Sequence, residues 1–207
     1  MILWGRASSV NVQKVLWALA ELDLTYAHRT VGGKYGGLDD PAFAALTPVR
    51  KVPVLQDGDV AIWESHAILR HLARRTGRLG DPPGAVDSWM EFGSTALQPP
   101  FIAVFWQRVR LLPQDRSAGV EADSLAAIAS ALAMLDTGLS DGRAHLAGDA
   151  FTIADIAVGC LFHRLLDLYP DSLADTPHVA AWHARIAGRP HYRAWVAVSY
   201  DELRVQG

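Results

Sequence analysis

The sequence predicts two structural units of different class, a small mixed α/β unit followed by a larger all-helical unit. Two observations lead to this prediction. Short β-rich runs occur mainly before residue 64, whereas beyond residue 88 the apolar residues recur at helical spacing. Between these parts, the segment 76–88 holds three glycines and two prolines, which is typical of a linker. We therefore divide the chain into residues 1–77, a linker at 78–86 and residues 87–207.

The first unit has the predicted order strand, helix, strand, loop, strand, strand, helix. The corresponding segments are 2–4, 12–22, 25–29, 31–38, 52–55, 60–63 and a helix that begins near residue 67. Ser8 or Ser9 can cap the first helix. An Asp-Gly pair at 57–58 separates the last two strands and indicates a hairpin. The result is a βαβ unit with a right-handed crossover, extended by a ββα unit into a small mixed sheet.

The second unit contains helical patterns only. Leu125, Ile128, Leu132 and Leu135 form one apolar stripe. Two more helices are predicted at 153–168 and 179–186. The Pro99-Pro100 pair should kink or break the long helix that precedes them.

Composition excludes several classes of protein. The chain has 207 residues, 50% of them hydrophobic, and a net charge of −3, so it lacks the basic field that nucleic acid or an anionic membrane would attract. A single cysteine, Cys160, excludes an internal disulfide and a cysteine-rich zinc site. Histidine pairs spaced by five residues do not suit a helical metal site, so we expect no metal. With no secretory signal or membrane span expected, we predict a cytoplasmic protein.

Three segments combine residue types that bind small polar molecules. The Ser8-Ser9-Val10-Asn11 segment lies where a strand meets a helix, and a helix N-terminus offers free N–H groups to an anion. Pro53 interrupts a strand run, which places that strand at a sheet edge where an extended peptide can pair with it. Glu64-Ser65 lies at a second helix N-terminus, where a carboxylate and an ammonium can both be held. Ser65 can also cap that helix.

These segments, in this order, resemble the glutathione transferase superfamily over essentially the whole chain. A further segment, Leu146-Ala-Gly-Asp-Ala-Phe-Thr-Ile-Ala-Asp-Ile156, is similar to the family's signature in its helical domain. Within it, Thr152 and Asp155 have the spacing of a capping box, with a structural role. The resemblance implies an N-terminal thioredoxin-like domain, a C-terminal helical bundle domain and a homodimer.

The resemblance also implies residue roles around glutathione, which would be the co-substrate. Ser9 matches the serine that hydrogen-bonds the thiolate, with Asn11 assisting. The remaining matches are Lys51 near the glycyl carboxylate, Val52 pairing its backbone with the cysteinyl residue, Pro53 as the family's cis-proline, and Glu64 with Ser65 at the γ-glutamyl end.

The predicted reaction is attack of the glutathione thiolate on a small apolar electrophile. Hydrogen bonds and the helix dipole would lower the thiol pKa. Candidate residues of the electrophile pocket are Tyr35, Phe101, Phe105, Trp106 and Arg108, and Arg108 could serve an anionic substrate.

Three other functions stay open. The Ser9-x-Asn11 spacing resembles a bacterial class of glutathione-dependent disulfide oxidoreductases, which work by thiol–disulfide exchange. The paired serines Ser8-Ser9 are similar to those of maleylacetoacetate isomerases, although Asn11 stands where those proteins have cysteine. Finally, transferase-like domains also serve as non-catalytic interaction modules.

Overall fold

The first part of the chain forms a four-stranded mixed sheet with helices on both faces. Its elements are β1 (Ile2–Trp4), α1 (Val10–Glu21), β2 (Ala27–Arg29), η1 (Gly33–Tyr35), α2 (Pro41–Ala44), β3 (Val54–Asp57), β4 (Val60–Trp63) and α3 (Ser65–Thr76). The computed structural model describes residues 1–205. The strand order is β2-β1-β3-β4, with β1 parallel to β2 and antiparallel to β3. The predicted βαβ-ββα order is confirmed.

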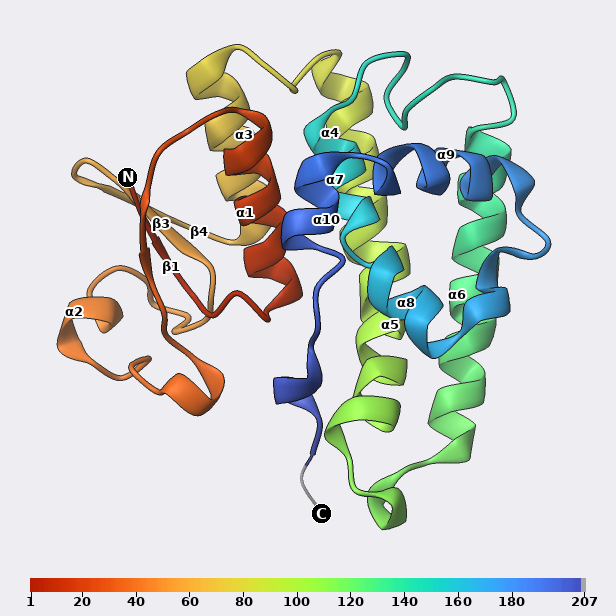
Figure 1. The fold of residues 1–207 in the computed structure, drawn as a ribbon, viewed down its shortest axis with the longest axis horizontal. Helices are drawn as coiled ribbons and strands as arrows, with labels where there is room; N and C mark the ends of the chain where they lie inside the picture. The colour runs from red at the N-terminus through yellow and green to blue at the C-terminus, as the bar shows by residue number, and fades with distance from the viewer. Residues whose placement is uncertain (206–207) are drawn as a thin grey trace.

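The alternation of side chains along the strands determines which helices pack on each face of the sheet. Leu3 in β1 is paired with Leu55 in β3, and both are fully buried in the core that α1 and α3 share with the helical part. The next pair, Trp4 and Val54, points the other way and packs against Phe43 of α2. Since successive side chains of a strand point to opposite faces, the pairing register of β1 with β3 determines which side chains lie on each face of the sheet. Figure 1 shows α1 and α3 between the sheet and the helical part, with α2 on the far side.

Pro53 does not lie on an edge strand, contrary to the expectation from the sequence. It precedes β3, which starts at Val54 and lies between β1 and β4. Because Pro53 falls outside the ladder, its missing N–H removes no strand hydrogen bond. The Val52–Pro53 peptide bond is cis.

The second part of the chain is helical throughout the described residues. Its elements are α4 (Pro83–Phe92), η2 (Gly93–Leu97), α5 (Gln98–Phe105), η3 (Trp106–Arg110), η4 (Pro113–Asp115), α6 (Ala118–Gly138), α7 (Ile153–Gly159), α8 (Phe162–Leu168), η5 (Pro170–Leu173), α9 (Pro177–Ala187), α10 (Pro190–Trp195) and η6 (Asp201–Leu203). The last four residues of the predicted linker, 83–86, already belong to α4. The division into domains stays a prediction.

The helix that contains Pro99-Pro100 is not broken. Helical backbone runs from Pro83 to Arg110, and the turn before the prolines, η2, is π-helical. The prolines occupy the first turn of α5, directly after this π-helical turn, so the two N–H donors that they lack fall where the hydrogen-bond spacing changes. A wider turn of this kind accommodates an imperfect hydrogen-bond ladder without a break.

The predicted helix at 153–168 is divided into α7 and α8, and its start is fixed by Asp155. The Asp155 carboxylate is fully buried and accepts hydrogen bonds from Leu146 N at 3.0 Å, Thr152 N at 2.8 Å and Trp182 Nε1 at 2.8 Å. The Thr152 hydroxyl in turn accepts from Ala154 N at 3.3 Å, so Thr152 and Asp155 form a capping box. The cap therefore joins α7 to α9 as well as closing its first turn.

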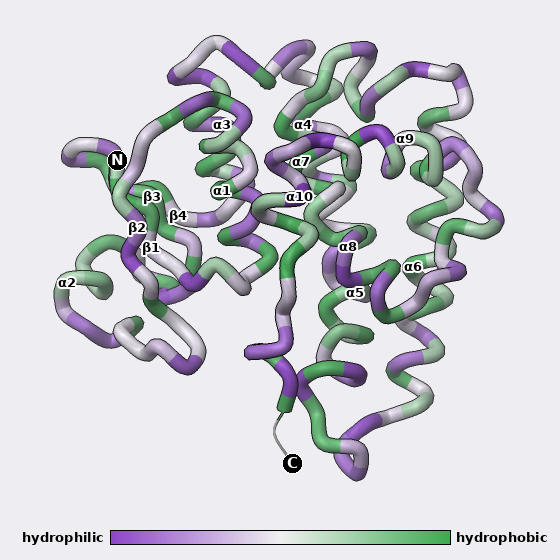
Figure 2. The backbone as a smooth tube through the Cα atoms, viewed as in Figure 1, coloured by the Kyte–Doolittle hydropathy of each residue, from purple (hydrophilic) through white to green (hydrophobic). Residues whose placement is uncertain are grey.

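Helix α6 is long and apolar enough to cross a membrane by length and composition alone. One of its faces packs in the core through Ile128, Leu132 and Leu135. The opposite face leaves Met134 58% exposed, and Figure 2 shows the largely hydrophobic colouring of the helix. A partly buried helix of a folded domain passes the same test, so this is weak evidence for a membrane segment.

Candidate active site

Ser9 occupies the N-cap position of α1 without acting as a side-chain cap. Its backbone is extended, with φ −79° and ψ 125°, and its hydroxyl makes no hydrogen bond to the first turn. The interpretation of Ser9 as an ordinary cap therefore does not hold. A hydroxyl at a helix N-terminus with no internal partner can donate to a bound anion, and the helix dipole favours negative charge there.

The segment that contains Val52 lies directly beside the loop leading to Ser9. A Cβ added to Gly5, the residue after β1, would lie 3.1 Å from Val52 Cβ and 2.6 Å from Val12 Cγ2. Glycine is therefore needed at this point, because β1, α1 and the Val52 segment approach so closely. Lys51, next to Val52, is exposed.

Glu64 and Ser65 occupy the start of α3 in an unusual conformation. Glu64 has φ +68° and ψ 123°, in the region that favours glycine, and its side chain caps nothing. Such a conformation costs about 1–3 kcal/mol and is found mostly at functional sites. Ser65 is not the predicted cap, since it already lies in the first helical turn, and its Oγ donates instead to Asn11 Oδ1 at 3.5 Å.

Asn11 is grouped with Glu64 and Ser65 rather than with Ser9. Together with Gln98 of α5, these three residues line a pocket of about 300 Å³. Asn11 Oδ1 also accepts from Gln98 Nε2 at 3.4 Å. Residues two apart at a helix start do not face each other, so Ser9 and Asn11 point to different places. The pocket offers a carboxylate, a hydroxyl and amides, which suit the two charges of an α-amino-acid end.

A buried lysine donates hydrogen bonds to two residues that line this pocket. Lys14 is 1% exposed, and its Nζ donates to Gln98 Oε1 at 2.6 Å and to His66 Nε2 at 3.2 Å. Burial lowers the pKa of Lys14 to about 8 and that of His66, which also faces Lys14, to about 3. His66 is therefore a neutral acceptor. Sequence reasoning missed this contact, although a lysine one turn after Asn11 on a mainly buried helix face was a signal for it.

The half-buried His66 makes the free energy of unfolding depend on pH. The unfolded chain protonates His66 near pH 6.5, whereas the folded chain does so only near pH 3, so the unfolded state binds more protons between these values. The free energy of unfolding should fall as pH drops below 6.5, by at most about 1.4 kcal/mol per pH unit. We expect His66→Gln to flatten this slope in urea unfolding at pH 7, 6 and 5. The exposed His178→Gln is the control, and an unchanged slope in His66→Gln would refute the assignment.

A second hollow, of about 360 Å³, lies on the other side of the Ser9 loop. Its lining includes Ser8, Thr30, Tyr35, Ser199 and Glu202. It is therefore built from the β1–α1 loop, the loop after β2 and the C-terminal segment. The C-terminal segment was not anticipated in the sequence, because it is remote from every other site residue along the chain.

Of the five residues predicted for the electrophile pocket, Tyr35 alone lines this hollow. Phe101 and Phe105 are buried in the core, and Trp106 is half exposed. Arg108 donates to Glu121 Oε1 at 2.6 Å and to Tyr169 at 3.2 Å. Its guanidinium is therefore already paired with a carboxylate.

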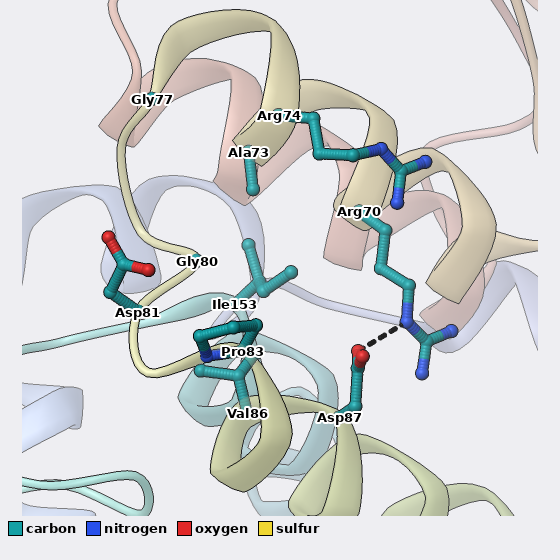
Figure 3. A pocket seen from close by; sticks show the side chains of 10 residues that line it. All are labelled: Arg70, Ala73, Arg74, Gly77, Gly80, Asp81, Pro83, Val86, Asp87 and Ile153. Carbon is teal, nitrogen blue, oxygen red and sulfur yellow. Dashed lines mark hydrogen bonds and ion pairs between the residues drawn. The ribbon is translucent and has the colours of Figure 1, made fainter.

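Two other features lie outside this site. A pocket between α3 and α4 contains Arg70, whose Nε donates to Asp87 at 2.6 Å, and no predicted site residue (Figure 3). Cys160 is buried, and its burial raises the pKa of the thiol to about 12, so it stays protonated. Within residues 1–205, no group of three potential metal ligands comes together.

Comparisons with known proteins match both parts of the chain. The model for the glutathione S-transferase N-terminal domain matches residues 1–74, and that for the C-terminal domain matches residues 86–190. Glutathione S-transferase GstB of Escherichia coli is 30% identical over 204 residues, covering 95% of this chain and 97% of the relative. Glutathione S-transferase 4 of Zea mays is 32% identical over 198 residues, covering 91% and 88%.

A comparison with solved structures indicates the same family. The theta class glutathione S-transferase of Xanthomonas axonopodis pv. citri, with glutathione bound, superposes with a TM-score of 0.88 at 34% identity, covering 96% of this chain and 98% of that one. The chain is a member of the glutathione S-transferase family.

Proposed function

We propose that this protein activates the thiol of glutathione at Ser9 and transfers it to a small electrophile. The observation that carries the proposal is the Ser9 hydroxyl, which stands at the N-terminus of α1 and makes no capping hydrogen bond to its first turn. The γ-glutamyl end would bind at Glu64 and Ser65, and the cysteinyl backbone would lie along Val52 after the cis bond to Pro53. Lys51, which is exposed, would approach the glycyl carboxylate.

The role of Ser9 follows from the chemistry of the thiol. A free thiol has a pKa near 8.5, so it is mostly protonated at neutral pH. A hydrogen bond to the thiolate and the dipole of α1 would both favour the charged form. A lowering of about two units, or about 2.7 kcal/mol, would make the thiolate the major form at pH 7. The sulfur then bonds to the electrophilic carbon, the leaving group departs with its electron pair, and the thiol proton goes to solvent.

Two assays on one preparation distinguish this proposal from the alternative functions. We expect conjugation of 1-chloro-2,4-dinitrobenzene to exceed glutathione-dependent reduction of a small disulfide. Dominant reduction would make the protein a disulfide oxidoreductase. Failure to bind glutathione in a calorimetric titration would make it a non-catalytic module.

We also propose a cytoplasmic homodimer, as the family resemblance implies.

A further inference from the structure

The guanidinium of Arg164 contacts the loop that carries Ser9. Arg164 belongs to α8 and is 3% exposed, and its Nη2 donates to Ser8 O at 2.8 Å and to Gln13 Oε1 at 3.0 Å. Burial lowers the pKa of Arg164 to about 10, so the guanidinium stays charged at pH 7 and keeps its donors. Among residues 1–205, no carboxylate forms an ion pair with it. Because a cation buried without a carboxylate partner is unfavourable, a gain in fold stability is not a sufficient explanation for this residue.

The peptide group between Ser8 and Ser9 is held at both of its polar ends. Ser9 N donates to Arg6 O at 3.0 Å, which closes the turn before α1. Ser8 O accepts from Arg164, and among residues 1–205 it accepts no other hydrogen bond. Ser8 is 8% exposed, so its carbonyl depends on a partner from the protein. Rotation of this peptide group would change the φ of Ser9, which is −79°, and with it the direction of the Ser9 side chain.

Two aromatic rings hold the guanidinium in place. Arg164 Cζ lies 5.3 Å from the ring centroid of Phe105 and 5.2 Å from that of Tyr200, within the range of cation–π contacts. Tyr200 is itself attached to α8, because its hydroxyl donates to the Asp167 carboxylate. The C-terminal segment that carries Tyr200 descends alongside α5 in Figure 1. Contacts from α5 and the C-terminal segment therefore keep the guanidinium directed at Ser8 O.

We propose that Arg164 is a positioning residue of the reaction, whose guanidinium fixes the Ser8–Ser9 peptide group so that the Ser9 hydroxyl faces the thiol of glutathione. This proposal rests on the proposed function at Ser9. Arg164 acts through the loop rather than on the sulfur, since its Nη2 is engaged by Ser8 O and Gln13 Oε1. A displacement of a reacting group by about 1 Å can lower a rate about 100-fold. The helical part of the chain thereby fixes the orientation of a residue in the first part.

The first test compares Arg164→Met with Arg143→Met when glutathione is bound. Arg143 is the matched control because it also donates to backbone carbonyls, those of Gly138 and Leu146, away from Ser9. We expect Arg164→Met to raise the pKa of the bound thiol by about one unit and to lower kcat/KM at pH 7 about tenfold, and Arg143→Met to change neither. The ultraviolet absorbance of the thiolate against pH gives the thiol pKa. An unchanged thiol pKa in Arg164→Met, where Ser9→Ala does raise it, overturns the proposal.

A double variant shows whether Arg164 acts through Ser9. We expect Arg164→Met combined with Ser9→Ala to have the same thiol pKa as Ser9→Ala alone, because the hydroxyl that Arg164 positions is then absent. Additive changes in the thiol pKa would mean that the guanidinium charge acts on the thiolate directly, and they would overturn the positioning role.

Hydrogen exchange in the protein without glutathione separates a failure of this proposal from a failure of the proposed function. We expect the Ser9 amide, which donates to Arg6 O, to exchange about tenfold faster in Arg164→Met and at the original rate in Arg143→Met. Faster exchange supports the fixing of the loop by Arg164 even if Ser9→Ala leaves conjugation unchanged, a result that would overturn the proposed function. Unchanged exchange overturns the role of Arg164 even if Ser9→Ala abolishes conjugation.

Arg164→Lys is the second variant, for use if circular dichroism shows that Arg164→Met does not fold. Lysine keeps the positive charge but lacks the planar guanidinium that contacts two acceptors and two rings. We expect the same increases in thiol pKa and in exchange of the Ser9 amide, at reduced size. Unchanged values in Arg164→Lys would overturn the role of the guanidinium.

Discussion

Replacing Ser9 with alanine is expected to lower kcat/KM for conjugation by about 10- to 100-fold at pH 7. A hydrogen bond to a charged group contributes about 1.5–3 kcal/mol, and its loss would raise the pKa of bound glutathione by about one to two units. The deficit should therefore shrink as pH rises, because the thiolate then forms without help. The measurements are the pH profile of kcat/KM and the ultraviolet absorbance of bound thiolate.

Two further variants show whether the effect belongs to the Ser9 hydroxyl. Ser9→Thr keeps the hydroxyl and should restore most of the activity. Asn11→Ala should instead raise KM for glutathione with little change in the thiol pKa, because Asn11 contacts Ser65 and Gln98. If Ser9→Ala stays active while Asn11→Ala abolishes turnover, the assignment of Ser9 is wrong.

Asp155→Ala is expected to be the most destabilising single substitution considered, at about 3–5 kcal/mol, since it removes the acceptor from a buried charged network. Leu146 N, the backbone and hydroxyl of Thr152, and Trp182 Nε1 would all lose their partner. Urea unfolding at pH 7 measures the loss. The comparison is Thr152→Ala, which removes the cap of α7 and one of the four donors to Asp155 and should cost about 1 kcal/mol. A loss below 1 kcal/mol in Asp155→Ala would mean that these donors find other acceptors.

The local features of the fold were predictable because they depend on neighbouring residues. The β1 strand, the α1 helix and the 57–58 hairpin follow from apolar spacing and turn residues within a few positions. The Thr152–Asp155 capping box is equally local. One prediction was wrong: the strand after Pro53 is not at the sheet edge, because strand order depends on long-range pairing that no local pattern specifies. At Pro99-Pro100 the sequence predicts a kink or a break, and the structure has unbroken helical backbone with a π-helical turn for which the sequence gives no signal.

Only the local part of the candidate site was predictable from the sequence, because its long-range contacts depend on the folded chain. Glu64 and Ser65 were recognised as a helix start, but the positive φ of Glu64 and the contact of Ser65 with Asn11, 54 positions away, required the folded chain. The sequence analysis does not anticipate buried Arg164, whose Nη2 donates to Ser8 O at 2.8 Å, because the two residues lie 156 positions apart.

The sequence by itself determined the order of elements and the family, since each depends on short segments read in order. Only the tertiary structure decided which remote residues lie together in the candidate site. Arg164 of α8 donates to Ser8 O at 2.8 Å, and Glu202 of η6 lines a hollow together with Ser8, so segments remote in the sequence meet at the loop before α1. Electrostatic effects depend on distance and burial, which no local pattern specifies.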